Sequence, residues 1–73
     1  MQKRNVLGRK IKEMRKKKGI TQEQLTARLN IQGIEIDQSR VSKIESQIRP
    51  IFDYQIEGFA KALGVSIEEL FNK

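Results

Sequence analysis

The chain has 73 residues and contains neither cysteine nor histidine, which excludes disulfide bonds, thiol nucleophiles, imidazole acid–base catalysis and Cys/His zinc sites. Its length fits one domain, residues 1–73, with room for one modest core, so we expect neither an enzyme nor a bound cofactor or metal. Residues 1–20 carry nine Lys and Arg against one acidic residue, a basic end that would attract a polyanion but that, taken alone, is more simply a solvated helix face.

Residues 1–5 are expected to form a flexible basic segment ahead of the first helix. No signal-peptide stretch follows them, and no apolar run approaches the roughly 18 residues of a membrane-spanning helix, so we expect a cytoplasmic protein without a membrane partner. Apolar residues at spacings of three and four then predict a helix over residues 6–18, ended by Gly19. These residues are Val6, Leu7, Ile11 and Met14.

A second helix is predicted to begin after Thr21, because Thr21 and Gln24 have the spacing of a capping box, and to bury Leu25 and Leu29. Residues 30–36 read as a connector, since Asn30 and Gly33 favour turns. We expect the second helix to extend towards Gln32. Ile34 or Ile36 should then be buried on the core, with contact to a partner as the alternative.

A third helix is predicted from about Gln38 to Gln47, with Asp37 as its N-cap and with Pro50 stopping the chain from continuing as a helix. At about 100° per residue, Val41, Ile44 and Ile48 fall on its apolar side. The opposite side carries Ser39, Ser42, Lys43 and Ser46, with Gln38 and Arg40 on the two flanks.

The rest of the chain predicts two more helices. Asp53 is expected to cap the fourth and Gly64 to end it, and Ser66 and Glu69 have the spacing of another capping box before a short fifth helix. The predicted fold is therefore all-α, a compact five-helix bundle in which helices 2 and 3 are joined by a lengthened connector.

The outer side of the third helix has the chemistry of a surface that reads DNA. B-DNA's major groove admits an α-helix, and Gln, Ser, Lys and Arg can pair with base edges there. The alternative is a plain amphipathic helix whose outer residues meet only water. The pattern of these ten residues alone does not exclude that alternative.

The order of residues along nearly the entire chain resembles the phage-repressor-like (lambda repressor-like, XRE) family of helix-turn-helix transcriptional regulators. Four segments carry the resemblance, in the family's order. They are Gly8-Arg9-Lys10-Ile11-Lys12-Glu13-Met14-Arg15, Gly19-Ile20-Thr21-Gln22-Glu23-Gln24-Leu25, Gln38-Ser39-Arg40-Val41-Ser42-Lys43-Ile44-Glu45 and Ala60-Lys61-Ala62-Leu63-Gly64-Val65-Ser66.

The resemblance implies roles for particular residues. The N-terminal amides of the second helix, at Thr21, and the Gln22 side chain would meet a phosphate, as would Arg40 and Arg49, for which ordinary surface cations are the alternative. Arg15 and Glu45 match a structural ion pair between the first and third helices. The residues facing bases would be Gln38, Ser39, Ser42 and Lys43.

Two departures from the family pattern are visible. The connector over residues 30–36 is longer than the usual tight turn, and Ser46-Gln47-Ile48 stands where the family often carries a glycine after the third helix.

The sequence as a whole favours a regulator of transcription, acting as a repressor and binding double-stranded DNA as a homodimer on a palindromic site. The alternative is an antitoxin-like module that grips another polypeptide. Its candidate contact residues would be Phe52, Tyr54, Ile56 and Phe71, although a domain of this size is expected to keep most of its aromatic residues inside.

Overall fold

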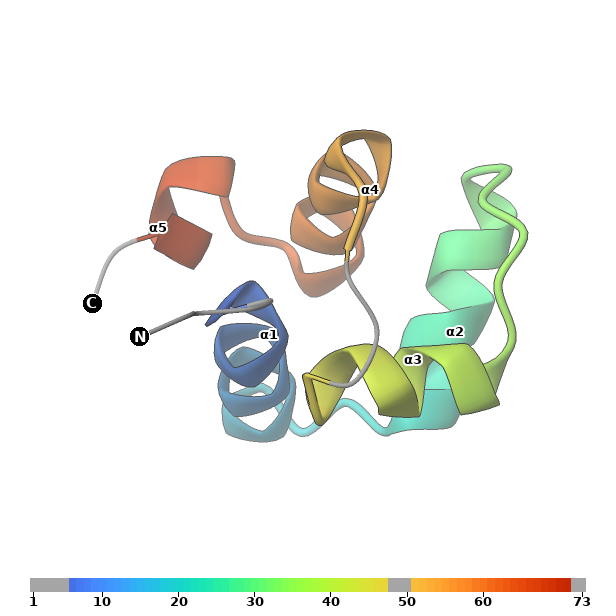
Figure 1. Cartoon of the computed structure of the whole chain (residues 1–73), viewed down its shortest axis with the longest axis horizontal. Helices are drawn as coiled ribbons and strands as arrows, with labels where there is room; N and C mark the ends of the chain where they lie inside the picture. Colours follow the sequence, from blue (N-terminus) through green and yellow to red (C-terminus); the bar gives the residue numbers. More distant parts are fainter. Residues whose placement is uncertain (1–5, 48–50, 72–73) are drawn as a thin grey trace.

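The structure is a computed structural model that describes residues 6–47 and 51–71. Within these ranges it contains five α-helices and no strand, which confirms the expected all-helical architecture (Figure 1). Residues 1–5, Ile48, Arg49 and Pro50, on which several expectations rest, lie outside the described ranges. The helices are α1 (Val6–Lys17), α2 (Gln22–Ile31), α3 (Gln38–Glu45), α4 (Asp53–Leu63) and α5 (Ile67–Phe71).

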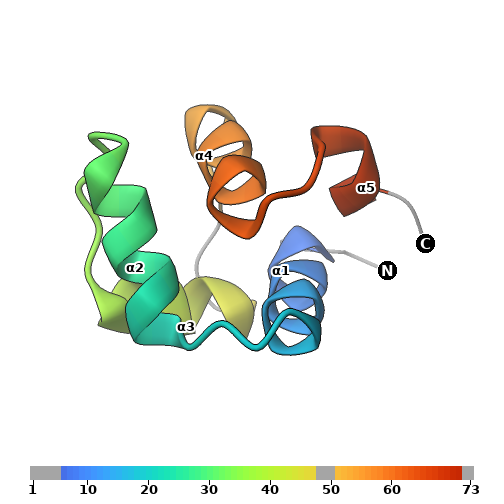
Figure 2. The same ribbon diagram turned by 180° about the vertical axis from the view of Figure 1, so that it is seen from behind.

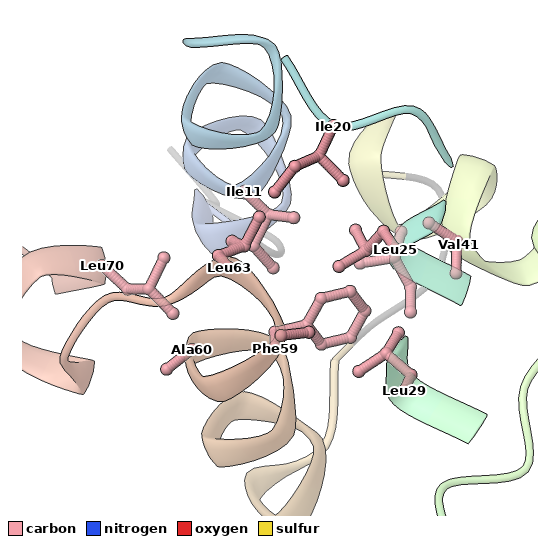
Figure 3. Packing of buried hydrophobic residues seen from close by; sticks show 11 residues of the cluster. Ile11, Ile20, Leu25, Leu29, Val41, Phe59, Ala60, Leu63 and Leu70 are labelled. Atoms are coloured by element: carbon pink, nitrogen blue, oxygen red, sulfur yellow. The ribbon is translucent and has the colours of Figure 1, made fainter. Parts of the chain in front are cut away.

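Helix α3 packs against both α1 and α2, while α4 packs against α2 and meets α1 and α5 (Figures 1 and 2). The apolar stripes of the helices therefore converge on one core, in which the ring of Phe59 points towards Leu25 and Leu29 (Figure 3). No helix of the described ranges has the length and apolar character needed to cross a membrane. The buried apolar residues are Ile11, Ile20, Leu25, Leu29, Val41, Ile44, Phe59, Ala60, Ala62, Leu63 and Leu70.

Two predicted capping boxes are confirmed. The Thr21 hydroxyl accepts from the Gln24 amide at 3.0 Å, and the Gln24 side-chain oxygen accepts from the Thr21 amide at 2.9 Å. Ser66 and Glu69 make the same reciprocal pair before α5, at 3.1 and 2.8 Å. These bonds satisfy backbone donors that a helix start otherwise leaves free, and so fix where α2 and α5 begin.

The expected N-cap of α4 was wrong by one residue. The helix begins at Asp53 itself and Phe52 is the N-cap, with its amide donating to the side-chain oxygen of Gln55 at 3.0 Å. Gln55 is buried, and its side-chain oxygen satisfies the amide of the N-cap residue itself, whereas the apolar Phe52 side chain offers no acceptor to the first turn of the helix. The predicted end of the helix is confirmed, since Gly64 has a φ of 73°.

The connector between α2 and α3 is a loop held in place by hydrogen bonds. Helix α2 ends at Ile31 with Gln32 as its C-cap, close to the expected limit. The Asn30 side-chain amide then donates to the carbonyls of Ile34 and Ile36, at 2.9 and 3.0 Å. Both isoleucines are half-buried and pack against the core, in line with the expectation that Ile34 or Ile36 would be buried there.

The placement of the aromatic residues differs from the expectation. Phe59 is fully buried, but Phe52 and Tyr54 are 45% and 67% exposed. The inner stripe of α4 passes through Gln55, Phe59 and Leu63 at helical spacing, which leaves Tyr54 on the outside and Phe52 before the helix. The side chain of Phe71 lies outside the described part of the chain.

Candidate nucleic-acid interface

The third helix presents one polar side to solvent and one apolar side to the core. Val41 and Ile44 are completely buried, whereas the residues predicted to read bases are exposed. The outward placement on which the sequence interpretation depends is therefore present in the structure. The exposed residues are Gln38, Ser39, Ser42 and Lys43.

The start of this helix is fixed by the predicted N-cap. One carboxylate oxygen of Asp37 accepts a hydrogen bond from the Arg40 amide at 2.8 Å. Gln38 is consequently the first helical residue, at the end of α3 that lies beside the start of α2.

Arg15 of α1 and Glu45 of α3 form a two-point ion pair in the interior. Arg15 Nε donates to Glu45 Oε2 at 2.6 Å, and Arg15 Nη2 donates to Glu45 Oε1 at 3.0 Å. The remaining Nη1 donates to the Ile20 carbonyl at 2.9 Å. Arg15 is 8% and Glu45 3% exposed, so both charges are held away from solvent and are satisfied by hydrogen bonds.

Gln22 belongs to the same network, which sequence reasoning did not foresee. Its side-chain Nε2 donates to Glu45 Oε1 at 3.0 Å, so the carboxylate joins α1, α2 and α3. The Gln22 amide group expected to meet a phosphate is thus engaged inside the protein. The interval between residues 22 and 45 is too long for any local pattern to reveal this contact.

The N-terminus of α2 nevertheless keeps donors for an anion. The Thr21 amide and hydroxyl are used in the capping box. The backbone amides of Gln22 and Glu23 have no acceptor among the described residues, as expected for the first turn of a helix. An open groove lies at this point, lined in part by Lys16, Thr21 and Gln22, and it reaches Gln38 at the start of α3.

Arg40 lies on the other flank of α3, in a second cleft that sequence reasoning missed. Its side chain is half-buried, and its Nε atom is buried without a hydrogen-bond partner in the described structure. No sequence signal brings the walls of this cleft together, because they come from three separate segments. They include Glu35 and Asp37 of the connector, Arg40 of α3, and Phe52, Tyr54 and Gln55 at the start of α4.

Comparisons with known proteins agree with this geometry. A family model described as helix-turn-helix matches residues 11–70. Among solved structures, the chain is similar to the restriction-modification controller protein C.AhdI from Aeromonas hydrophila, with 31% sequence identity and a TM-score of 0.78. That similarity covers 89% of this chain and 91% of C.AhdI. No match was found among curated protein sequences.

Proposed function

The chain belongs to the helix-turn-helix family of DNA-binding transcriptional regulators, and from that premise we propose that it reads a specific double-stranded site with α3 lying in the major groove. The observation that carries the proposal is the separation of the two sides of α3. Val41 and Ile44 anchor the helix from behind, while its polar side is open to solvent and bears no acidic group, since Glu45, the one acidic residue of the helix, is buried. A side of this shape and polarity fits a groove that admits one α-helix.

The base-reading residues in this proposal are Gln38, Ser39, Ser42 and Lys43. A Gln amide can pair in two-point fashion with adenine, Lys donates to guanine acceptors, and Ser both donates and accepts. All four are exposed, and Gln38 borders the groove at the start of α2. Base contacts of this kind would supply the sequence preference.

The phosphate contacts are proposed at the N-terminus of α2, with Thr21 and Gln22, and at Arg40 and Arg49. At α2 the proposal rests on the backbone amides of the first turn rather than on the Gln22 side chain, because that side chain donates to Glu45. Lys16, which also lines this groove, adds positive charge beside it. The Arg15–Glu45 pair is assigned to holding α3 in place and not to contacting DNA.

We propose further that the protein represses transcription as a homodimer in the cytoplasm. One copy offers a single α3, which covers one half-site, and a two-fold pair would read a palindrome whose half-sites lie about 34–36 Å apart. The similar C.AhdI is a restriction-modification controller protein and is matched over 91% of its length, which supports a regulatory role for a chain this short.

The test is a selection of bound duplexes from a random pool with the full chain, repeated with a Gln38→Ala/Lys43→Ala variant as the matched control. We expect a palindromic consensus with the native chain and a weaker or altered consensus with the control. Retention on DNA through a salt gradient separates this function from the protein-partner alternative. Elution at very low salt together with no enriched sequence would overturn the proposal.

A further inference from the structure

The side chain of Asn30, in the last turn of α2, is bonded to the peptide unit that precedes the N-cap of α3. Its Nδ2 group donates to the carbonyls of Ile34 and Ile36, at 2.9 and 3.0 Å. The Ile36 carbonyl belongs to the peptide unit that links Ile36 to Asp37, and Asp37 is that N-cap. Figure 1 shows the connector running back along α2 to the start of α3. One amide group thus joins the end of α2 to the residue that fixes where α3 begins.

The same connector is also held on α4, at Gly58. The Gln32 side-chain amide donates to the Gly58 carbonyl at 2.9 Å, and the end of the Ile34 side chain fills the space that a β-carbon at residue 58 would need. Gly58 itself is buried. The connector is therefore fixed on two helices before it reaches α3.

Gln38 is the residue whose placement depends most directly on these contacts. It follows the N-cap and is the first residue of α3. The backbone amides of a helix's first turn have no intrahelical acceptor, so the start of α3 takes its position largely from the segment before it. A two-point contact with a base edge requires donor and acceptor to be aligned together, which in turn requires the side chain to be held within about 0.5 Å of the productive position.

We propose that Asn30 and Gly58 are positioning residues for base reading, which hold the connector so that Gln38 meets its base pair in the orientation that a two-point contact requires. The inference rests on the proposed function and goes beyond it, because neither residue lies on the polar side of α3. Asn30 stands at the opposite end of α2 from the groove that Gln38 lines, and Gly58 is buried in α4. Their effect on sequence preference is transmitted through the connector.

Asn30→Ala is the first test, with binding measured on the selected duplex and on its single-base-pair variants, well below the Tm. The variant is expected to lose about three- to tenfold in discrimination, as for one of the two hydrogen bonds of such a contact. The loss should fall at the base pair that Gln38→Ala also affects, with the other positions unchanged. Because the readout is a ratio of affinities for two duplexes, a loss of stability alone does not change it.

Arg28→Met is the matched control. Arg28 Nη1 donates to the Ala62 carbonyl at 2.9 Å, a bond between α2 and α4 that does not involve the connector. Its loss is expected to lower Tm and to leave the preference at every base pair unchanged. The positive charge removed with Arg28 affects all duplexes equally and cancels in the ratio.

A double variant tests whether Asn30 acts through Gln38. Two residues that contribute to one contact are not additive, so Asn30→Ala should cause no further loss of discrimination at that base pair in a Gln38→Ala background. Equal losses in both backgrounds would mean that Asn30 does not act through Gln38.

Gly58→Ala tests the seat on α4 and keeps the inference testable if Asn30→Ala does not fold. The new methyl group displaces Ile34 and is expected to relax the preference at the same base pair. The Gly58→Ala/Ile34→Val variant should restore it, because valine lacks the Cδ1 atom that the methyl group meets. A buried glycine cannot touch DNA, so this change and its rescue would report positioning alone.

The outcomes separate this inference from the proposed function. For either residue, a preference that stays unchanged, that falls equally at all positions, or that changes only at positions unaffected by Gln38→Ala refutes the positioning role, while DNA reading by α3 stands. If the native chain enriches no sequence, the proposed function fails, and this inference fails with it.

Discussion

The side chain of Ile34 lies directly against the α-carbon of Gly58, so that its Cδ1 atom occupies the space that a β-carbon at residue 58 would need. The connector is tied to α4 at the same place by Gln32, whose side-chain amide donates to the Gly58 carbonyl at 2.9 Å. The added residues between α2 and α3 are thus seated on the one helical position of α4 that has no side chain.

Substituting Gly58→Ala is therefore expected to lower stability. An Ala in place of Gly inside a helix normally stabilises by roughly 1 kcal/mol, but here the new methyl group displaces Ile34, and we expect a net loss of about 1 kcal/mol from overpacking. Urea denaturation followed by circular dichroism measures this change in the free energy of unfolding. In an Ile34→Val background, which lacks Cδ1, the same substitution should stabilise; a loss of equal size in both backgrounds would contradict the contact.

Loss of the Glu45 carboxylate should be among the most costly single changes in the protein. Glu45→Ala leaves the buried Arg15 guanidinium without its partner and frees the Gln22 amide. Removing one member of a buried pair typically costs about 3–5 kcal/mol. Thermal denaturation should show a large drop in Tm, and an unchanged Tm would mean that the ion pair does not hold α3 on α1.

Lys43→Ala should have the opposite profile, because Lys43 is exposed on the polar side of α3. We expect an unchanged Tm and a weaker complex with DNA. If Lys43 also contacts a phosphate, the slope of log affinity against log salt should fall by about 1. Lys61→Ala removes an equal charge from an exposed position of α4 and is the control. If both changes weakened DNA binding equally, Lys43 would contribute only its charge and no specific contact.

Gln38→Ala is expected to relax the sequence preference at one base pair. A two-point contact between a side chain and a base is worth about 1–3 kcal/mol of discrimination. Titrations with the selected duplex and with its three variants at each position would show the loss of discrimination at a single position. Equal losses on selected and random DNA would instead mean that Gln38 does not read sequence.

Gln47→Gly is expected to stabilise the protein. Gln47 has a φ of 68° and is the only described residue other than glycine in the left-handed region, where an L side chain costs roughly 1–2 kcal/mol. Glycine relieves this strain, but it also has more conformational freedom in the unfolded chain, which offsets part of the stabilisation. We therefore expect a net stabilisation of about 1 kcal/mol and a higher Tm. Gln47→Ala keeps the strain and should not raise Tm; matching effects of Gly and Ala would contradict this account.

Local patterns in the sequence were sufficient for much of the fold. The capping boxes of Thr21 and Ser66, the left-handed Gly64 and the spacing of Val41 and Ile44 each depend on residues within one or two helical turns. The outward side of α3 follows from the same spacing. The missing glycine after α3 was also informative, since Gln47 adopts the conformation that a glycine would favour there.

Contacts between distant residues could not be read in this way. The bond from Gln22 to Glu45, the seat of Ile34 on Gly58 and the cleft beside Arg40 each join segments far apart in the chain. The exposure of Tyr54 was missed for a related reason. Composition suggested that aromatic residues were needed in the core, whereas Gln55 takes the inward position at the start of α4.

On α3, the residues proposed to contact DNA are separate from the residues that pack into the core, and this separation bears on how the protein could change its target. The side chains of Gln38, Ser39, Ser42 and Lys43 are exposed, while the buried residues of the helix are Val41, Ile44 and Glu45. The outward four can therefore be exchanged without disturbing the interior that orients them. The same scaffold could be redirected to a new operator, in evolution or by design, through a handful of substitutions on one exposed strip.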